Sequence, residues 1–430
     1  MKRNHKVVVA AAAGLAAALA LSACSTSGSS SGGSASTTHL TFLTFETPDL
    51  TAKFWDNSIS DAEKQVPGVT VKQLVSPNSD RNAYAKQLQA SGQFPDVLAS
   101  IDPTQFTPAG LLKPFSKSWL DANFTDPTGN NIDGKTYIPP TNTQIVPMIF
   151  YNKEIFKKDG ITSVPTTWNE FLADVKTIKA DGQTPLEMAG GDPSFVDYTL
   201  TAIITADVLA KNPNWVEDRA ANKVKFTDAD MAAAFQKYEN LIQAGAFSSG
   251  ALGVSYNDAN SQFIAGDAAM YPMGSWLLGQ ITQKQSSEFG TFILPSDTGK
   301  TIIPFVTGGT TSVSTKGPDV TKAVNFAKAW SLSKSTMKTL IETDGAFPNL
   351  KKTPFSAFDA TVTPLYKQAY AFVTDDNVKV DAFGQVSNQS SLPAAVNTQL
   401  ASTAQKMFTD TDINSQLAAL DAAWAQSAQQ

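Results

Sequence analysis

The chain has 430 residues, of which 42% are hydrophobic and 17% are charged. This composition is typical of a globular protein and excludes a disordered or fibrous one, and the length suffices for two domains with sizeable cores. The formal net charge is −6, and without the three cations near the N-terminus 30 basic and 39 acidic residues remain, a charge of −9. Because phosphate binding needs a basic face, nucleic acid is excluded as a partner.

The N-terminal residues predict an export signal followed by a tether. Lys2, Arg3 and Lys6 precede an apolar run over 7–21, which is too short for a membrane span. The next residues, Leu21-Ser22-Ala23-Cys24, resemble the lipobox of bacterial lipoproteins. This resemblance implies a signal peptide over 1–23, lipidation of Cys24 and a flexible Ser/Gly tether over 24–38. The alternative is an ordinary signal peptide with an incidental cysteine.

Residues 39–99 predict alternating strands and helices. Strands are expected over 39–45 and 69–74 and from Phe94 onward. A helix is expected over 47–65, and a second one is capped by Asp80 and stopped by Gly92. This β-α-β-α-β order indicates a mostly parallel sheet with helices on both of its faces.

The stretch 133–171 organises the rest of the chain. Asp133-Gly134 is a turn signal before a short strand over 135–138, and the apolar run 144–151 predicts a buried strand. An amphipathic helix is expected over 152–158, ended by Gly160, and Thr167 and Glu170 predict a capping box at the start of a longer helix. Further on, residues 263–277 predict a helix end, a buried strand and another helix start, and the last hundred residues are helical.

The string DGKTY-x-P, YNKEIFKKDGI and P-TTWNEF within 133–171 resembles the central signature of extracellular solute-binding proteins of bacterial ABC importers. The closest group is the carbohydrate-binding one, which includes maltose-binding protein. Two other strings are similar to the same family, namely Y-x-KQLQASG-x-x-PDV over 84–97 and F-x-x-G-x-AAM followed by GSW over 263–276. The resemblance extends from about residue 40 to about residue 350.

This resemblance implies an α/β protein with the two-lobe periplasmic-binding-protein-like fold. Each lobe would be a mostly parallel sheet flanked by helices, and a hinge would join the lobes. The first lobe would comprise 39–146 and 296–333, and the second 147–295 and 334–430. Ligand would bind between the lobes, at the ends of the strands.

The residue types that support most catalytic and metal sites are scarce. After the predicted signal peptide the only histidine is His39 and the only cysteine is Cys24, so no Ser-His-Asp, Cys-His or His/Cys metal arrangement is expected. No phosphate-binding P-loop motif occurs, and we expect no cofactor and no metal. A glycosidase would need two carboxylates across a sugar, and the candidates near loops are Glu46, Asp102, Asp192 and Asp197. Sequence alone does not show the distance between any two of them. The resemblance implies another role for such carboxylates, that of accepting hydrogen bonds from sugar hydroxyls, so we expect no enzyme.

The resemblance also implies ligand-binding positions. Trp276 follows Gly274-Ser275 and matches the tryptophan that stacks on ligand in the family, although it could instead anchor the core. The other predicted positions, each of which could be an ordinary loop end, are Glu46, Asp102, Asn142, Gln144, Gly309 and Phe347. Ile145 stands where maltose-binding protein has a hinge carboxylate, which argues against a maltodextrin as the ligand.

The predicted function is capture of an extracellular solute, a mono- or oligosaccharide, for delivery to the permease subunits of an ABC importer. The protein would be a monomer, held by its lipid on the extracytoplasmic side of the cell membrane, and ligand would close the hinge. Two alternatives stay open at this point. One is a secreted carbohydrate-active enzyme, and the other is a lipid-tethered sugar sensor or adhesin.

Overall fold

The first of three four-stranded sheets has the order β12-β3-β1-β2. It is built from β1 (Thr38–Thr44), β2 (Val69–Val75), β3 (Val97–Ala99) and β12 (Thr311–Val313). β1 pairs in parallel with both β2 and β3, and only β12 is antiparallel to its neighbour β3. The expectation of a mostly parallel sheet is therefore confirmed here. The computed structural model describes residues 37–427 apart from 78–79, 298 and 376, so Cys24 and most of the predicted tether lie outside it.

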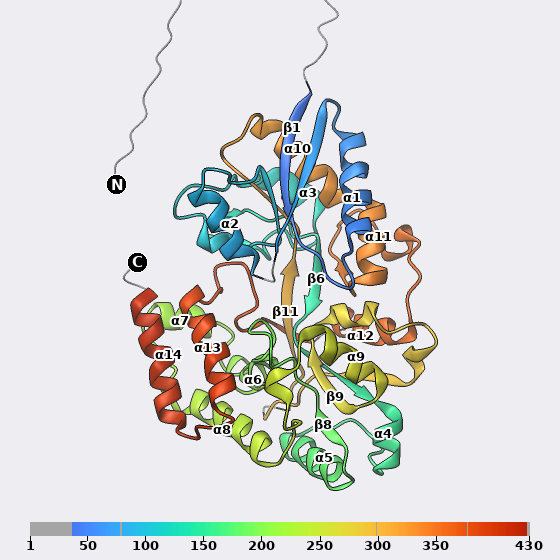
Figure 1. Ribbon diagram of the computed structural model, residues 1–430, viewed down its shortest axis with the longest axis vertical. Coiled ribbons are helices and arrows are strands. Elements are labelled where there is room, and N and C mark those ends of the chain that lie inside the picture. The colour runs from blue at the N-terminus through green and yellow to red at the C-terminus, as the bar shows by residue number, and fades with distance from the viewer. Residues whose placement is uncertain (1–36, 78–79, 298, 376, 428–430) are drawn as a thin grey trace, which may run out of the picture. The chain divides into compact units, whose positions relative to one another are not determined.

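Neighbouring residues of β1 contribute to different hydrophobic cores on the two faces of this sheet. Phe42 packs with α1 (Ala52–Gln65) and α10 (Val320–Leu332), whereas Leu43 packs with α2 (Arg81–Ala90). Because successive side chains of a strand point to opposite faces, the sheet is covered on both sides. Figure 1 shows α1 and α2 on either side of β1.

The second sheet has the order β10-β7-β9-β8. Its strands are β7 (Met148–Asn152), β8 (Thr184–Leu186), β9 (Ala268–Met273) and β10 (Phe289–Phe292). β7 runs antiparallel to both β9 and β10, and only β8 and β9 are parallel. The prediction of a mostly parallel sheet is wrong for this lobe. The reason is that β7 enters the sheet at Met148, which pairs with the last residue of β9, so the two strands run in opposite directions.

A third sheet connects the other two and has the order β13-β6-β11-β14. It consists of β6 (Asn142–Ile145), β11 (Ile302–Gly308), β13 (Phe347–Pro348) and β14 (Val378–Asp381). The chain passes from the first sheet to the second along β6, and it returns along β11, which is antiparallel to β6. The single strand expected over 144–151 is divided into β6 and β7 by Pro147, which has no N–H to donate to a strand ladder.

The remaining elements cover these sheets. Thr167 and Glu170 form the predicted capping box of α5 (Trp168–Ala180). α14 (Ile413–Ser427) packs against both α13 (Ala394–Lys406) and α8 (Ala229–Gln243). The other helices are α3 (Lys117–Asn123), α4 (Lys153–Lys158), α6 (Tyr198–Ile204), α7 (Trp215–Ala220), α9 (Tyr256–Ala265), α11 (Lys334–Thr343) and α12 (Pro364–Thr374).

Short elements complete the connections. They are the paired strands β4 (Asn131–Ile132) and β5 (Lys135–Thr136), the 3-10 turns η1 (Pro103–Gln105), η3 (Ala251–Gly253), η4 (Ser275–Gly279), η5 (Gln285–Ser287) and η6 (Phe355–Phe358), and the π-helical turn η2 (Thr205–Leu209). None of the helices in the described part of the chain is long and apolar enough to cross a membrane.

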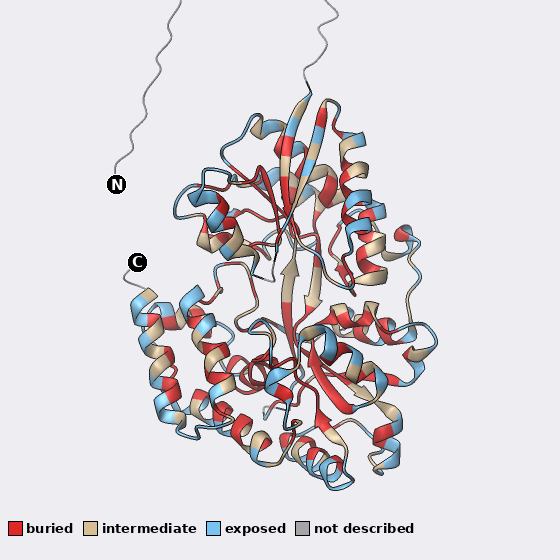
Figure 2. Cartoon of the chain, in the orientation of Figure 1, coloured by how far each residue is buried: buried red, intermediate tan, exposed pale blue. Residues whose placement is uncertain are grey.

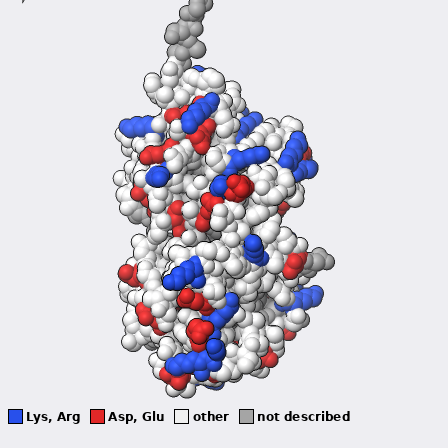
Figure 3. Space-filling model, turned by 90° about the vertical axis from the view of Figure 1, so that its right-hand side faces the viewer, with Lys and Arg blue, Asp and Glu red and all other residues white. Residues whose placement is uncertain are grey.

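Buried side chains are concentrated on the strands and on the inward faces of the helices (Figure 2). On the face that Figure 3 shows, acidic and basic side chains are interspersed, with no broad field of one sign. Such a face offers no electrostatic track for a polyanion.

Candidate ligand-binding site

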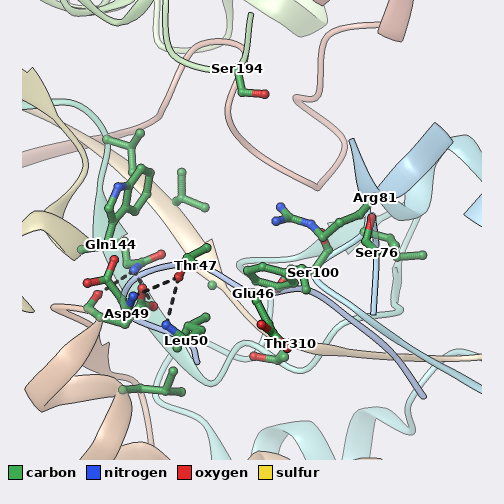
Figure 4. Close-up of a pocket in the computed structure, with 18 of the residues that line it drawn as sticks. Glu46, Thr47, Asp49, Leu50, Ser76, Arg81, Ser100, Gln144, Ser194 and Thr310 are labelled. Carbon is green, nitrogen blue, oxygen red and sulfur yellow. Dashed lines mark hydrogen bonds between the residues drawn. The ribbon is translucent and has the colours of Figure 1, made fainter. Parts of the chain in front are cut away.

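A cavity of about 910 Å³ is lined by Val75 of the first sheet, by residues of the connecting sheet and by residues of the loops and helices around them. Its wall includes the β1–α1 loop, the start of α2, β6, the end of β11, the segment before α6, the start of α9, η4 and the residue that follows α11. A cavity of this size is within the range that small-molecule sites occupy. Figure 4 shows part of its polar lining.

The β1–α1 loop presents Asp49 to the cavity. The hydroxyl oxygen of Thr47 accepts hydrogen bonds from the main-chain N–H groups of Asp49 (3.2 Å) and Leu50 (2.9 Å), which fixes a tight turn. The Nε2 of Gln280, which follows η4, donates to the Oδ2 of Asp49 at 2.9 Å. Burial raises the pKa of Asp49 to about 7, and the hydrogen bond from Gln280 opposes this rise.

A second carboxyl group, that of Asp344, lies just after α11. The Nε2 of Gln144 on β6 donates to its Oδ2 at 3.1 Å and to its main-chain oxygen at 3.0 Å. Burial raises the pKa of Asp344 well above its ordinary value, and the charge of Asp49 raises it further. The amide of Gln144 and the guanidinium of Arg81 act in the opposite direction. The cavity thus holds two carboxyl groups whose ionisation is linked.

Arg81, the first residue of α2, is the cation of the cavity. Its Nε donates to the main-chain oxygen of Ser100 at 3.1 Å, and its guanidinium carbon lies 4.1 Å from the centre of the Phe45 ring. Figure 4 shows its side chain across the cavity from Asp49 and Gln144. Burial lowers the pKa of Arg81 to about 10, so the group stays charged at neutral pH. Among the described residues, none forms an ion pair with Arg81 within 4.0 Å.

Four aromatic rings form another wall of the cavity. Phe195 stacks on Tyr256 with ring centres 4.4 Å apart, and the ring of Trp276 lies 6.5 Å from Phe195 and 6.3 Å from Tyr198. The indole of Trp276 folds back over Gly274, where a Cβ would overlap its ring. A glycine at this position therefore lets the half-buried ring lie against its own backbone at the cavity surface.

Five of the predicted site residues line this cavity: Glu46, Asn142, Gln144, Trp276 and Gly309. The Oδ1 of Asn142 is buried beside Gly308 and has no hydrogen-bond partner among the described residues. A Cβ on Gly309 would overlap the main-chain oxygen of Pro139, so the close approach of these two backbone segments requires glycine.

The other two predicted residues, Asp102 and Phe347, do not line this cavity. The carboxylate of Asp102 caps η1, accepting from the N–H of Thr104 at 3.0 Å and from its hydroxyl at 2.7 Å. The side chain of Phe347 is fully buried. Its ring packs against Tyr366 and Tyr370, with ring centres 5.3 and 5.8 Å away.

Several cavity residues were missed by the sequence reasoning. They are Asp49, Arg81, Phe195, Tyr198, Tyr256 and Asp344. Asp49 and Arg81 follow the ends of β1 and β2, which is the same signal that selected Glu46. Asp344 carries no comparable local signal, since it simply ends a helix.

Of the four carboxylates considered for a glycosidase, two line the cavity and two do not. Glu46 and Asp192 line the cavity, whereas Asp102 and Asp197 do not. In the described part of the chain, no group of three or more His, Cys, Asp or Glu side chains could hold a metal ion.

Comparison with known proteins identifies the family. The family profile of bacterial extracellular solute-binding proteins matches residues 47–337. The chain belongs to this family. Over 323 residues this solute-binding protein is 29% identical to the multiple sugar-binding protein of Streptococcus mutans, covering 73% of this chain and 75% of the relative.

Two further comparisons bear on the fold and on the ligand. The solved structure of a chitin oligosaccharide binding protein matches with a TM-score of 0.80 and 22% identity, covering 92% of this chain and all (100%) of the other. Over 172 residues this solute-binding protein is 30% identical to the sn-glycerol-3-phosphate-binding periplasmic protein of Brucella abortus, covering 38% of this chain and 37% of the relative. The fold is therefore the two-lobe α/β fold of solute-binding proteins.

Proposed function

We propose that this protein captures a sugar, a mono- or oligosaccharide, in the cavity and delivers it to the permease of an ABC importer. The observation that carries the proposal is the chemistry of the cavity wall. A sugar has apolar C–H faces and a polar edge of hydroxyl groups, so a site that binds one needs aromatic rings and hydrogen-bonding side chains together. The rings of Trp276 and Tyr256 and the polar groups of Asp49, Gln144 and Asp344 meet both needs.

The ligand chemistry of one relative points in the same direction. The relative from Streptococcus mutans, which aligns over most of both chains, is named for sugar binding. We infer that the cavity of this protein serves the same class of solute. Delivery to a permease follows from membership of the solute-binding family, whose proteins present captured solute to a membrane importer.

A thermal-shift screen of the soluble part against a sugar library tests the proposal. A ligand that binds only the folded protein raises the melting temperature by mass action. We expect at least one neutral sugar to do so, and we expect Trp276→Ala to reduce that shift. Product analysis after long incubation with the same sugar examines the enzyme alternative, since a binding protein leaves its ligand intact. A library in which no saccharide produces a shift would refute sugar capture.

Ligand capture would close a hinge between two lobes. We propose 39–146 with 296–333 as the first lobe and 147–295 with 334–430 as the second, with β6 and β11 as the strands that cross between them. A ligand that contacts both lobes stabilises the closed state by its differential affinity for it. Small-angle scattering of the monomer should show a smaller radius of gyration at saturation, and an unchanged radius would contradict closure.

A lipid anchor on Cys24 would hold the protein outside the cell at the membrane. The support is the sequence Leu21-Ser22-Ala23-Cys24 behind an apolar run, followed by a Ser/Gly tether. Cys24→Ser should release the protein into the medium. Equal retention of the variant in the membrane fraction would rule the anchor out.

A further inference from the structure

The charged groups that line the cavity are mostly carboxylates. The acidic side chains of the lining are Glu46, Asp49, Asp192 and Asp344. Arg81 is the only basic residue among the described residues that line it, and no lysine or histidine does. The carboxyl groups therefore outnumber the cations by four to one.

Within the described residues, the carboxyl groups of Asp49 and Asp344 form no ion pair within 4.0 Å. In the described part of the chain, the only donor to the side chain of Asp49 is Gln280, and the only donor to that of Asp344 is Gln144. An amide satisfies one acceptor site, whereas a carboxylate offers about four. Both groups thus have capacity to accept further hydrogen bonds, and sugar hydroxyls are donors of the right kind.

Arg81 is already engaged within the protein. Its Nε–H donates to Ser100 and its guanidinium plane lies over Phe45. The charge of Arg81 also acts on Asp344, the carboxyl group that it helps to ionise. An anionic ligand at Arg81 would therefore compete with a negative group that the protein supplies.

We infer that Asp49 and Asp344 make the cavity selective for sugars that carry no negative charge, so that sugar acids and sugar phosphates are rejected. The inference rests on the proposed function. The opposite outcome is a real alternative, because one relative is named for binding sn-glycerol 3-phosphate. The selectivity arises because an anion would bring a like charge toward the buried Asp49 and the half-buried Asp344, where Coulomb repulsion is screened less than in bulk water.

This selectivity should depend on pH in a defined direction. The titratable and charged groups whose fields reach Asp49 or Asp344 are Tyr256 of α9, Arg81 of α2 and the two carboxyl groups themselves. Because the pKa of Asp49 is about 7, its carboxyl group is mostly protonated at pH 5.5 and mostly ionised at pH 8. Repulsion of an anion should therefore be stronger at pH 8 than at pH 5.5.

Isothermal titration calorimetry of the full soluble chain tests the inference. Neutral probes are raffinose, stachyose and the chitin disaccharide, supplemented by the neutral sugar that gives the largest thermal shift. Anionic probes are glucuronic acid, cellobiuronic acid, sn-glycerol 3-phosphate and the 6-phosphate of that best sugar. At pH 8 we expect each anionic probe to bind at least about tenfold more weakly than the best neutral sugar. Coulomb repulsion between charges a few Å apart in a partly buried site is large enough for such a loss of affinity. The ratio of neutral-sugar affinity to anionic-probe affinity should be smaller at pH 5.5.

Charge-removing variants assign the effect to its residues. Asp49→Asn preserves side-chain size and should narrow the neutral-to-anionic affinity ratio by about threefold or more at pH 8, and the double variant Asp49→Asn/Asp344→Asn should narrow it at least as far. Asp56→Asn on α1 is the matched control, because Asp56 is exposed and does not line the cavity. The affinity ratio of this variant should equal that of the wild type. The melting temperature of each variant, measured without ligand, confirms that it is folded.

The possible outcomes separate the two proposals. Tighter binding of an anionic probe than of any neutral sugar overturns the selectivity but leaves solute capture standing. An affinity ratio that is the same in the wild type and in both Asn variants also overturns it. Failure of every saccharide to bind overturns sugar capture, and the selectivity with it.

Discussion

The two walls of the cavity differ in chemistry and in how the chain builds them. One wall, called the charged wall, holds the carboxyl groups of Asp49 and Asp344, from the β1–α1 loop and the residue after α11, and Arg81 at the start of α2 lies across the cavity from Asp49. The other wall consists of rings, from the segment before α6, the start of α9 and η4. The carboxyl groups of Asp49 and Asp344 each accept one hydrogen bond from a glutamine amide, whereas the rings contact one another.

This difference indicates how the two walls divide recognition. Hydrogen bonds that sugar hydroxyls donate to fixed carboxylates depend on direction and distance, so the charged wall should distinguish the positions of those hydroxyls. Ring contacts tolerate many orientations and depend mainly on buried area, so the aromatic wall should contribute affinity with less discrimination. Variants that damage one wall at a time can test this division.

The largest effect is expected where the charged wall is supported by backbone. A Cβ on Gly279 would overlap the main-chain oxygen of Thr343, the residue before Asp344. Gly279→Ala should therefore lower the free energy of unfolding by about 3 kcal/mol, as overpacking against rigid atoms does. Urea unfolding measures it, and Gly253→Ala, where no atom lies within 4 Å of the added Cβ, is the matched control. Equal stability of the two variants would contradict this account.

A smaller effect is expected when a ring is removed from the aromatic wall. Trp276→Ala should weaken sugar binding by about 2 kcal/mol, which is the scale of other aromatic stacking contacts. Its loss of stability should be smaller than that of a fully buried tryptophan, because the ring is half-buried. Calorimetry with the identified sugar measures the affinity. Trp119→Ala removes a half-buried ring outside the cavity, and an affinity loss of the same size in that variant would argue against a ligand platform.

The smallest effect concerns the protonation of the charged wall. The pKa of Asp49 is about 7 in the folded protein against 3.8 ordinarily, so between these values the folded state binds more protons than the unfolded state. Its contribution to the free energy of unfolding therefore falls as pH rises toward 7. Asp49→Asn should be more stabilising, relative to wild type, at pH 8 than at pH 5, by on the order of 1 kcal/mol. Melting curves of the ligand-free proteins at both pH values measure this, with Asp56→Asn as the control that should show no such difference.

Sequence reasoning found Trp276 of the aromatic wall and the polar residues of the connecting strand β6, but it missed the other three rings and both carboxyl groups of the charged wall. The Gly274-Ser275-Trp276 string marks a turn with a ring after it, and the polar Asn142 and Gln144 stand just before the apolar residues that lead into the second sheet. Asp102 and Asp49 both follow a strand, but whether such a carboxylate caps a turn or faces a cavity depends on the path of the next residues. The face on which Phe347 lies is set by a two-residue strand, too short for a readable alternation.

The fold was predictable in its plan and less so in its strand directions. The β-α-β-α-β order correctly indicated the parallel pairing of β1 with β2 and β3. The second sheet has no such repeat. Its strand β7 follows directly from the connecting sheet, and β7 lies between β10 and β9. Long-range pairing of this kind depends on where the chain enters the sheet, which local patterns do not encode.

The placement of Trp276 gives the protein a built-in optical reporter. Of the seven tryptophans, five are buried, and the half-buried pair is Trp119 and Trp276. Trp276 is the half-buried one at the cavity surface, next to Phe195 and Tyr198. A sugar that covers this indole would remove water from it and shift its emission toward shorter wavelength, while Trp119 provides a steady background. Intrinsic fluorescence could therefore follow capture and release of the solute in real time without any attached dye.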